Sequence, residues 1–88
     1  MYELTLGKTT GKQVVKMVEK AMQERRKNTG KNVTKVDFCL AADMSRNMLH
    51  RYSRGEKPGS DGIAKIASGL ENWGIEVSVK MDTAALLR

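Results

Sequence analysis

The sequence predicts a small, mainly α-helical domain of four or five helices with a short β-strand near each end. Two patterns carry this prediction: apolar residues at helical spacing through the middle of the chain, and apolar–polar alternation at both ends. A third observation is the length of 88 residues, which suits one compact domain rather than two. We therefore treat residues 1–88 as a single domain.

The two terminal segments have the two-residue period of half-buried strands. Apolar and polar residues alternate over 2–6 (YELTL) and over 75–81 (IEVSVKM). Because a two-stranded ribbon is only marginally stable alone, we expect these strands to lean on the helices or on another chain. They are our candidates for a dimer-forming element, either by pairing across chains or by forming a ribbon that packs on a partner.

Capping residues and the 3.6-residue period place the helices between the strands. The first begins after Thr10, with Gln13 positioned for a capping box, and runs to about Asn28. Gly30 is its expected stop. The second helix is short and begins near Thr34, whose side chain can cap it.

Two further helices follow after a tight turn. Ser45 is expected to cap the third, which continues to Arg54 and is closed by Gly55. Ser60 is expected to cap the fourth, which ends at Trp73.

Composition narrows the classes of function. Sixteen Lys and Arg against ten Asp and Glu give a net charge of +6, which favours a polyanionic partner, most simply nucleic acid. With one cysteine and one histidine, we expect no disulfide framework, no metal site and no cofactor. No apolar run approaches the ~20 residues of a membrane span and no signal peptide opens the chain, so we expect a soluble, cytoplasmic protein.

The functional signal is concentrated in residues 38–55, which read FCLAADMSRNMLHRYSRG. Two short helices meet there across a turn of about three residues. A single seam is expected to bury Ala42, Met44, Leu49 and Tyr52 between them. This seam leaves a polar and basic outer face on the second of the two helices: Arg46, Asn47, His50 and Arg51. Such a helix fits the DNA major groove and can donate hydrogen bonds to base edges or phosphates.

The same stretch resembles the helix-turn-helix of the lambda repressor and Cro family. The helix-turn-helix itself is expected over about 34–55, and the resemblance covers roughly residues 33–74. Ser45 takes the family's serine position before the recognition helix, and Arg54 with Gly55 matches its closing arginine–glycine. Asp43 replaces the usual turn glycine, and aspartate tolerates the left-handed backbone conformation better than most residues. The resemblance implies a lambda-repressor-like fold.

The resemblance also implies roles for eight side chains. Base reading is implied for Arg46, Asn47, His50 and Arg51, and backbone or phosphate contact for Lys35, Ser45, Arg54 and Lys57. The implied protein is a sequence-specific double-stranded DNA-binding transcriptional regulator, most simply a repressor that binds an inverted repeat as a homodimer. Its small size and family fit a regulator carried by a mobile element. We expect no small-molecule ligand and no membrane partner.

Other classes of function stay open beside this one. An antitoxin or adaptor would use the same fold mainly to grip another protein and would bind DNA only weakly, through charge. Residues 84–87 would then be a docking stub, within a tail over 83–88 that is either a helical turn or frayed. An enzyme is disfavoured, because no paired acids, nucleophile–base pair or glycine-rich phosphate loop is present. Single-stranded nucleic acid would find few aromatic stacking platforms, since the chain has two Tyr, one Trp and one Phe.

Overall fold

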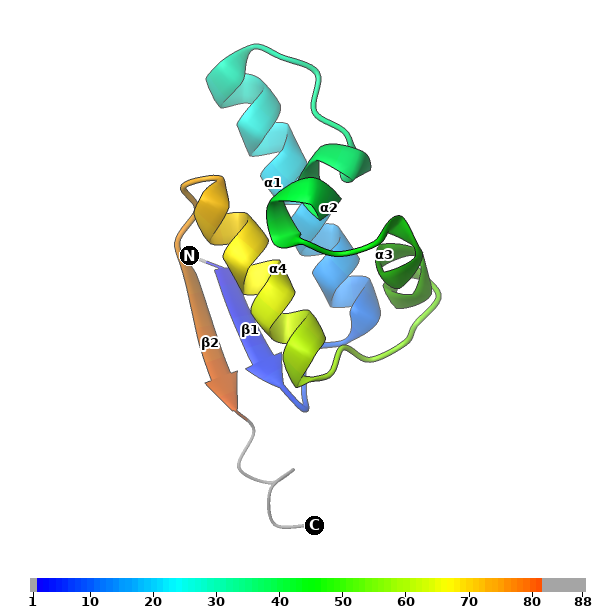
Figure 1. Cartoon of the computed structure of the whole chain (residues 1–88). Helices are drawn as coiled ribbons and strands as arrows, with labels where there is room; N and C mark the ends of the chain where they lie inside the picture. Colours follow the sequence, from blue (N-terminus) through cyan, green and yellow to red (C-terminus); the bar gives the residue numbers. More distant parts are fainter. Residues whose placement is uncertain (1, 82–88) are drawn as a thin grey trace.

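The computed structural model describes residues 2–81 and shows a mainly helical chain with a two-stranded sheet (Figure 1). The elements are, in order, β1 (Tyr2–Leu6), α1 (Gly11–Thr29), α2 (Lys35–Ala42), α3 (Arg46–Ser53), α4 (Ser60–Asn72) and β2 (Val77–Met81). Figure 1 shows the strands side by side at the left and α3 at the right, with α4 between them. The tail expected over 83–88 lies outside the described residues.

The two strands pair with each other, and they run parallel. Tyr2 lies beside Val77 and Leu6 beside Met81, so β1 and β2 form one ribbon within the chain. All four described helices make up the connection that parallel strands require. The prediction that β2 begins at residue 75 is wrong, because the Ile75 amide donates instead to Leu70 O (3.0 Å) and closes the end of α4.

The two strands differ in how well the helices cover them. Leu4 of β1 is fully buried in the core, whereas Val79 and Met81 of β2 are each 52% exposed. On the opposite face of the ribbon, Lys80 Nζ lies 2.7 Å from Glu3 Oε1. The hydrogen bond from Lys80, together with its charge, lowers the pKa of Glu3. The ribbon is therefore anchored through β1, with β2 as its outer strand.

Local capping fixes where three of the four helices begin. The side chains of Thr10, Thr34 and Ser45 each accept the backbone N–H three residues later, as predicted. The cap of α4 is Gly59 and not Ser60, so that prediction is wrong. The carbonyl of Gly59 already accepts from Ile63 N–H (2.9 Å), which makes Ser60 the first helical residue.

The core lies between α1, α2, α4 and the ribbon. Its fully buried large side chains are Leu4, Val14, Val18, Phe38, Ile66 and Leu70. Trp73 closes one end of it by packing edge-on against Phe38, with ring centroids 5.2 Å apart. No helix within residues 2–81 is both long and apolar enough to cross a membrane.

Gly11, the first residue of α1, lies very close to the backbone at the end of α3. A Cβ at this position would lie 2.5 Å from Tyr52 O and would also collide with Glu56 O. Because both obstacles are backbone atoms, we expect Gly11→Ala to lower the free energy of unfolding by about 1–3 kcal/mol. Urea denaturation followed by circular dichroism measures the change.

Gly59→Ser is the matched control, because Gly59 has no neighbour within 4 Å of an added Cβ and serine is a good helix cap. An unchanged midpoint for Gly11→Ala would contradict the close contact between α1 and the end of α3.

Candidate nucleic-acid interface

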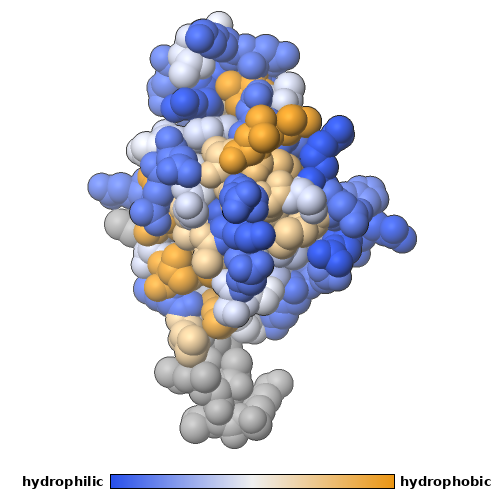
Figure 2. Space-filling view, in the orientation of Figure 1, coloured by the Kyte–Doolittle hydropathy of each residue, from blue (hydrophilic) through white to orange (hydrophobic). Residues whose placement is uncertain are grey.

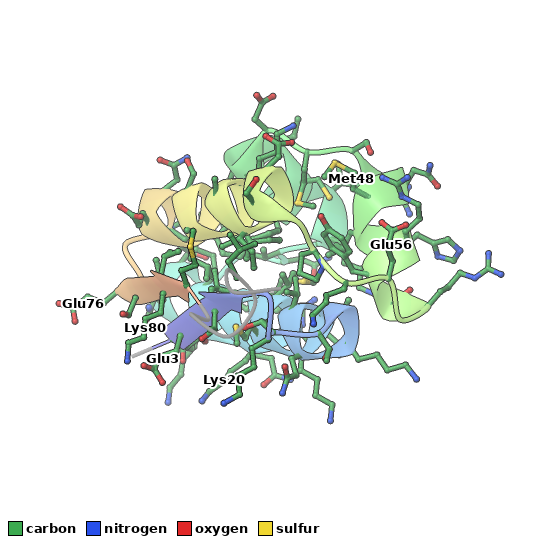
Figure 3. The ribbon with its side chains drawn as sticks, turned by 90° about the horizontal axis from the view of Figure 1, so that it is seen from below. Glu3, Lys20, Met48, Glu56, Glu76 and Lys80 are labelled. Carbon is green, nitrogen blue, oxygen red and sulfur yellow. The ribbon has the colours of Figure 1, made fainter. Side chains whose placement is uncertain are left out.

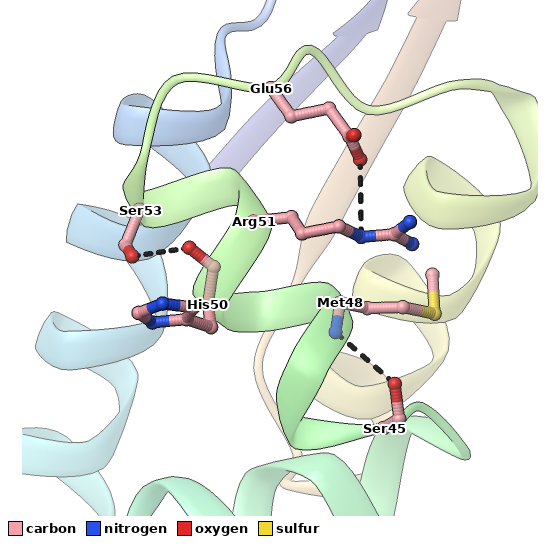
Figure 4. Close-up of polar contacts among 6 residues, drawn as sticks. All are labelled: Ser45, Met48, His50, Arg51, Ser53 and Glu56. Carbon is pink, nitrogen blue, oxygen red and sulfur yellow. Dashed lines mark hydrogen bonds and ion pairs between the residues drawn. The ribbon is translucent and has the colours of Figure 1, made fainter.

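The turn between α2 and α3 is built by its own backbone. Asp43 adopts the left-handed conformation (φ 53°, ψ 48°), and the Met44 amide donates to Cys39 O at 3.0 Å. Ser45 then caps α3 by accepting from Met48 N–H at 3.1 Å (Figure 4). The chain therefore passes from α2 to α3 through three residues, and the expectation that Asp43 takes the left-handed position is confirmed.

A buried seam holds α3 in one rotational setting. As predicted, it consists of Ala42, Met44, Leu49 and Tyr52, all buried. α4 supports α2 closely, since a Cβ at Gly69 would lie 2.7 Å from Ala42 Cβ. Because α3 has only eight residues, this packing rather than its own stability keeps it helical.

All eight predicted contact residues are exposed: Lys35, Ser45, Arg46, Asn47, His50, Arg51, Arg54 and Lys57. With Leu49 facing inward, the 100° step per residue puts Asn47 and Arg51 on the far side of α3, toward solvent. Figure 2 shows a hydrophilic surface on the right-hand side of the molecule, where Figure 1 places α3.

Three of these side chains surround one pocket. Lys35 from the start of α2 meets Arg46 and His50 of α3 around a floor that includes Val15 and Leu49. Burial raises the pKa of the Cys39 thiol, and the nearby charge of Arg46 partly offsets that rise. Arg46 lines this pocket together with Lys35 of α2. We call Lys35, Arg46 and His50 the basic cluster. Its first and last residues, Lys35 and His50, are 15 positions apart in the sequence.

Ser53 also lines this pocket, but its hydroxyl is occupied. Ser53 Oγ donates to the His50 carbonyl at 2.5 Å within α3 (Figure 4). The donors that remain at the pocket are therefore those of the basic cluster.

Arg51 has an acidic neighbour that the sequence analysis missed. Its Nε lies 3.6 Å from Glu56 Oε2, and the two side chains are 51% and 49% exposed (Figure 4). Glu56 follows α3 by a turn through Gly55 at φ 104°, and its amide donates back to Arg51 O. Side chains that face each other along a helix are three or four residues apart in the sequence. Arg51 and Glu56 are five residues apart, so helical spacing does not predict their ion pair.

Arg54 and Lys57 extend the surface beyond α3. Arg54 is the C-cap residue of the helix and Lys57 lies in the loop to α4. Neither has an ion-pair partner within residues 2–81.

Another exposed basic side chain, Lys20, lies on α1. Lys20 packs over the Tyr2 ring of β1, 5.6 Å from its centroid. Figure 3 shows Lys20 projecting from the opposite side of the molecule to Met48 and Glu56. Burial raises the pKa of Tyr2 to about 12, with a further contribution from Glu24. Positive charge alone therefore does not single out the α3 face.

No three His, Cys, Asp or Glu side chains within residues 2–81 lie together in a way that could hold a metal ion. Cys39 is buried on α2 and is not in a disulfide.

The capping bond of Ser45 is the local interaction that starts α3. Removing it in Ser45→Ala leaves the Met48 amide without this acceptor, so we expect the free energy of unfolding to fall by about 1 kcal/mol. Ser60→Ala is the matched control. Ser60 follows the α4 cap without making a capping bond, so this variant should change stability by less than about 0.5 kcal/mol. Thermal and urea unfolding measure both, and equal losses would contradict the assignment of the caps.

Comparisons of this chain with family models, with curated proteins and with solved structures gave no match. A proposal for the function of this chain therefore rests on the geometry and charge of the α3 face.

Proposed function

We propose that this chain is a sequence-specific double-stranded DNA-binding regulator in which α2 and α3 act as a helix-turn-helix. The observation that supports this most is the setting of α3, whose buried side is apolar and whose solvent side carries Arg46, Asn47, His50 and Arg51. A helix with its side chains is about 10–12 Å across, which matches the major groove at about 12 Å.

We assign each of these residues a contact according to its position on α3 or beside it. Asn47 and Arg51 project farthest from the core and read base edges, asparagine pairing with adenine and arginine with guanine. Arg46 and His50 read bases from the flank that they share with Lys35, which holds a phosphate. Ser45, Arg54 and Lys57 contact phosphates on either side of α3 and so set its position along the duplex.

One short recognition helix gives too little contact for tight specific binding. The chain therefore binds as a two-fold dimer on an inverted repeat, with half-sites about 34–36 Å apart so that both helices enter the same side of the duplex. Most simply, occupancy of such a site near a promoter represses transcription.

A protein-interaction function, as in an antitoxin or adaptor, is the second candidate, and one observation favours it. Val36 and Leu40 lie one turn apart on the solvent side of α2 and are 40% and 77% exposed. Figure 2 shows this hydrophobic patch over α2, above the centre of the molecule. A chain of this second kind would bind all duplexes alike, with an affinity that collapses as salt rises.

Selection of bound duplexes from a random pool tests the proposal. We expect one enriched inverted repeat, and a loss of binding to it of about 1–3 kcal/mol in Arg46→Ala and in Arg51→Ala. Lys20→Ala is the matched control, because it removes the same charge from the opposite side of the molecule. Fluorescence anisotropy with the selected duplex measures all three, and circular dichroism checks their folding.

Indiscriminate binding, or wild-type affinity in both arginine variants, would reject the assigned face. Indiscriminate binding that vanishes with salt would favour the protein-interaction function instead.

Glu56 offers a test in the opposite direction. Its carboxylate holds Arg51 and repels phosphates, so Glu56→Gln should tighten binding to the selected duplex by about 2–10-fold. Both partners of the ion pair are half exposed, so stability should change by less than about 0.5 kcal/mol. Glu71→Gln, near the far end of α4, is the control for the same change of net charge and should leave affinity unchanged. Weaker binding of Glu56→Gln would show that the Arg51–Glu56 pair positions the arginine instead of restraining it.

A further inference from the structure

A row of lysines runs along the first half of α1. Lys12, Lys16 and Lys20 follow one another at intervals of four residues, and all three are exposed. Four residues advance an α-helix by about 6 Å and turn it by about 40°, so the three side chains leave the helix on one side over about 12 Å. The row ends there, because the next position at this spacing is Glu24. We call these three residues the α1 lysine row.

The α1 lysine row carries like charges that no carboxylate balances within residues 2–81. Like charges four residues apart destabilise a helix. The ion pairs in this part of the chain belong to other cations, namely Arg51, Lys65 and Lys80. Lys20 lies over the Tyr2 ring instead of beside a carboxylate. The row is therefore a local cost in stability that an anionic partner would remove on binding.

A groove of about 530 Å³ lies between β1 and the row. Lys8 and Lys16 line it, together with Thr10 and Gln13 of the α1 capping box. Thr10 Oγ1 accepts from Gln13 N–H at 3.2 Å, and Gln13 Oε1 accepts from Thr10 N–H at 2.9 Å. The Thr10 hydroxyl hydrogen and the Gln13 side-chain NH₂ are left to donate. The groove therefore offers two ammonium groups and two neutral donors to an anion.

One carboxylate also lines the groove, and it is already paired. Glu3 Oε1 lies 2.7 Å from Lys80 Nζ. The hydrogen bond between them lowers the pKa of Glu3 and raises the pKa of Lys80, so both groups are charged at neutral pH and offset each other. The groove keeps the positive charge of Lys8 and Lys16. We call the groove and the α1 lysine row together the β1–α1 face.

We propose that the β1–α1 face binds the phosphate backbone of a second segment of double-stranded DNA without reading its bases. A lysine ammonium is a point charge on a flexible stem, which suits phosphates better than base edges. A row of about 12 Å spans about three or four phosphates of one strand.

The lining of the groove disfavours other polyanions and protein partners. Of its eight residues, one, Met17, is apolar, so the groove lacks the apolar centre that a protein interface has. None of the eight is aromatic, and a single strand binds mainly by stacking its bases on aromatic rings. A duplex presents its phosphates outward and needs neither feature.

The β1–α1 face lies away from α3. Figure 3 shows Glu3, Lys20 and Lys80 on the opposite side of the molecule to Met48 and Glu56. A duplex held by α3 therefore does not reach Lys20, and a chain that uses both faces joins two segments of DNA. Duplex binding by the β1–α1 face rests on the row and the groove alone, whereas the joining of two segments rests also on the proposed function.

Gln13→Glu tests the groove with the smallest change. Glutamate keeps the capping bond from Thr10 N–H, so the fold should be unchanged, which circular dichroism checks. The change turns the free NH₂ donor into a carboxylate oxygen that repels phosphates. In a chain that also carries Arg46→Ala and Arg51→Ala, which remove the contribution of α3, we expect affinity for a short duplex of random sequence to fall about 3–10-fold.

The control for this variant is Asn32→Asp, which makes the same amide-to-carboxylate change in the exposed loop after α1 and should leave affinity unchanged. Fluorescence anisotropy at low salt measures both.

Lys8→Gln together with Lys16→Gln tests the charges of the groove. In the same background, this pair should lower affinity for the duplex by about tenfold or more. It should also reduce the slope of log affinity against log salt by about two, because each phosphate contact contributes roughly 0.9. Lys31→Gln together with Lys65→Gln is the matched control, which removes the same charge from the loop after α1 and from α4. This control should change affinity by less than about threefold.

The joining of two segments is measured without the α3 variants. Beads that carry the selected duplex, saturated with the wild-type chain, should capture a fluorescent duplex of random sequence. The Lys8→Gln/Lys16→Gln chain should bind the beads normally but capture about tenfold less of the second duplex. The Lys31→Gln/Lys65→Gln chain should capture as much as the wild type.

Equal losses in the groove pair and its control would overturn the proposal, because net charge would then explain the binding. Unchanged affinity in Gln13→Glu would overturn it as well. Groove-dependent binding of duplexes by a chain that selects no inverted repeat would reject the proposed function and leave the β1–α1 face standing. Selection of an inverted repeat with no capture of a second duplex would do the reverse.

Discussion

The arrangement depends on the burial of one side of α3. Leu49 and Tyr52 are buried and fix the rotation of this short helix against α1 and α2, and the outward-facing side chains take their direction from them. An isolated helix of eight residues would not persist in water. The same packing that makes α3 a helix therefore also decides which of its charges reach solvent.

The position of the basic side chains on α3 matters more than the net charge of the chain. Basic side chains also lie away from α3, as Lys20 on α1 does, so net charge alone does not locate an interface. The α3 face differs because two helices contribute its cations, with Lys35 on α2 beside Arg46 on α3. Glu56 forms an ion pair with Arg51, and in the proposed function this pair weakens the attraction of the face for a polyanion.

The two-stranded ribbon joins segments from the two ends of the described chain. Because β1 pairs with β2 in parallel, residues 2–6 lie beside residues 77–81. The four described helices form the connection between the two strands. Tight anchoring of Leu4 leaves β2 as the outer strand, with half-exposed Val79 and Met81.

The sequence by itself determined the features that depend on neighbours within about four residues. The caps at Thr10, Thr34 and Ser45, the left-handed turn at Asp43 and the outward face of α3 all follow from local hydrogen bonds and helical periodicity. The DNA-contact roles of the eight residues stay a prediction.

Tertiary structure alone decided the features that join distant parts of the chain. It brought Lys35 to Arg46 and His50, set Glu56 against Arg51 through a turn, and made the terminal strands parallel. It also exposed the end of β2, where the alternating pattern predicts a half-buried strand. These outcomes depend on which surfaces meet after the helices pack, and local spacing carries no information about that.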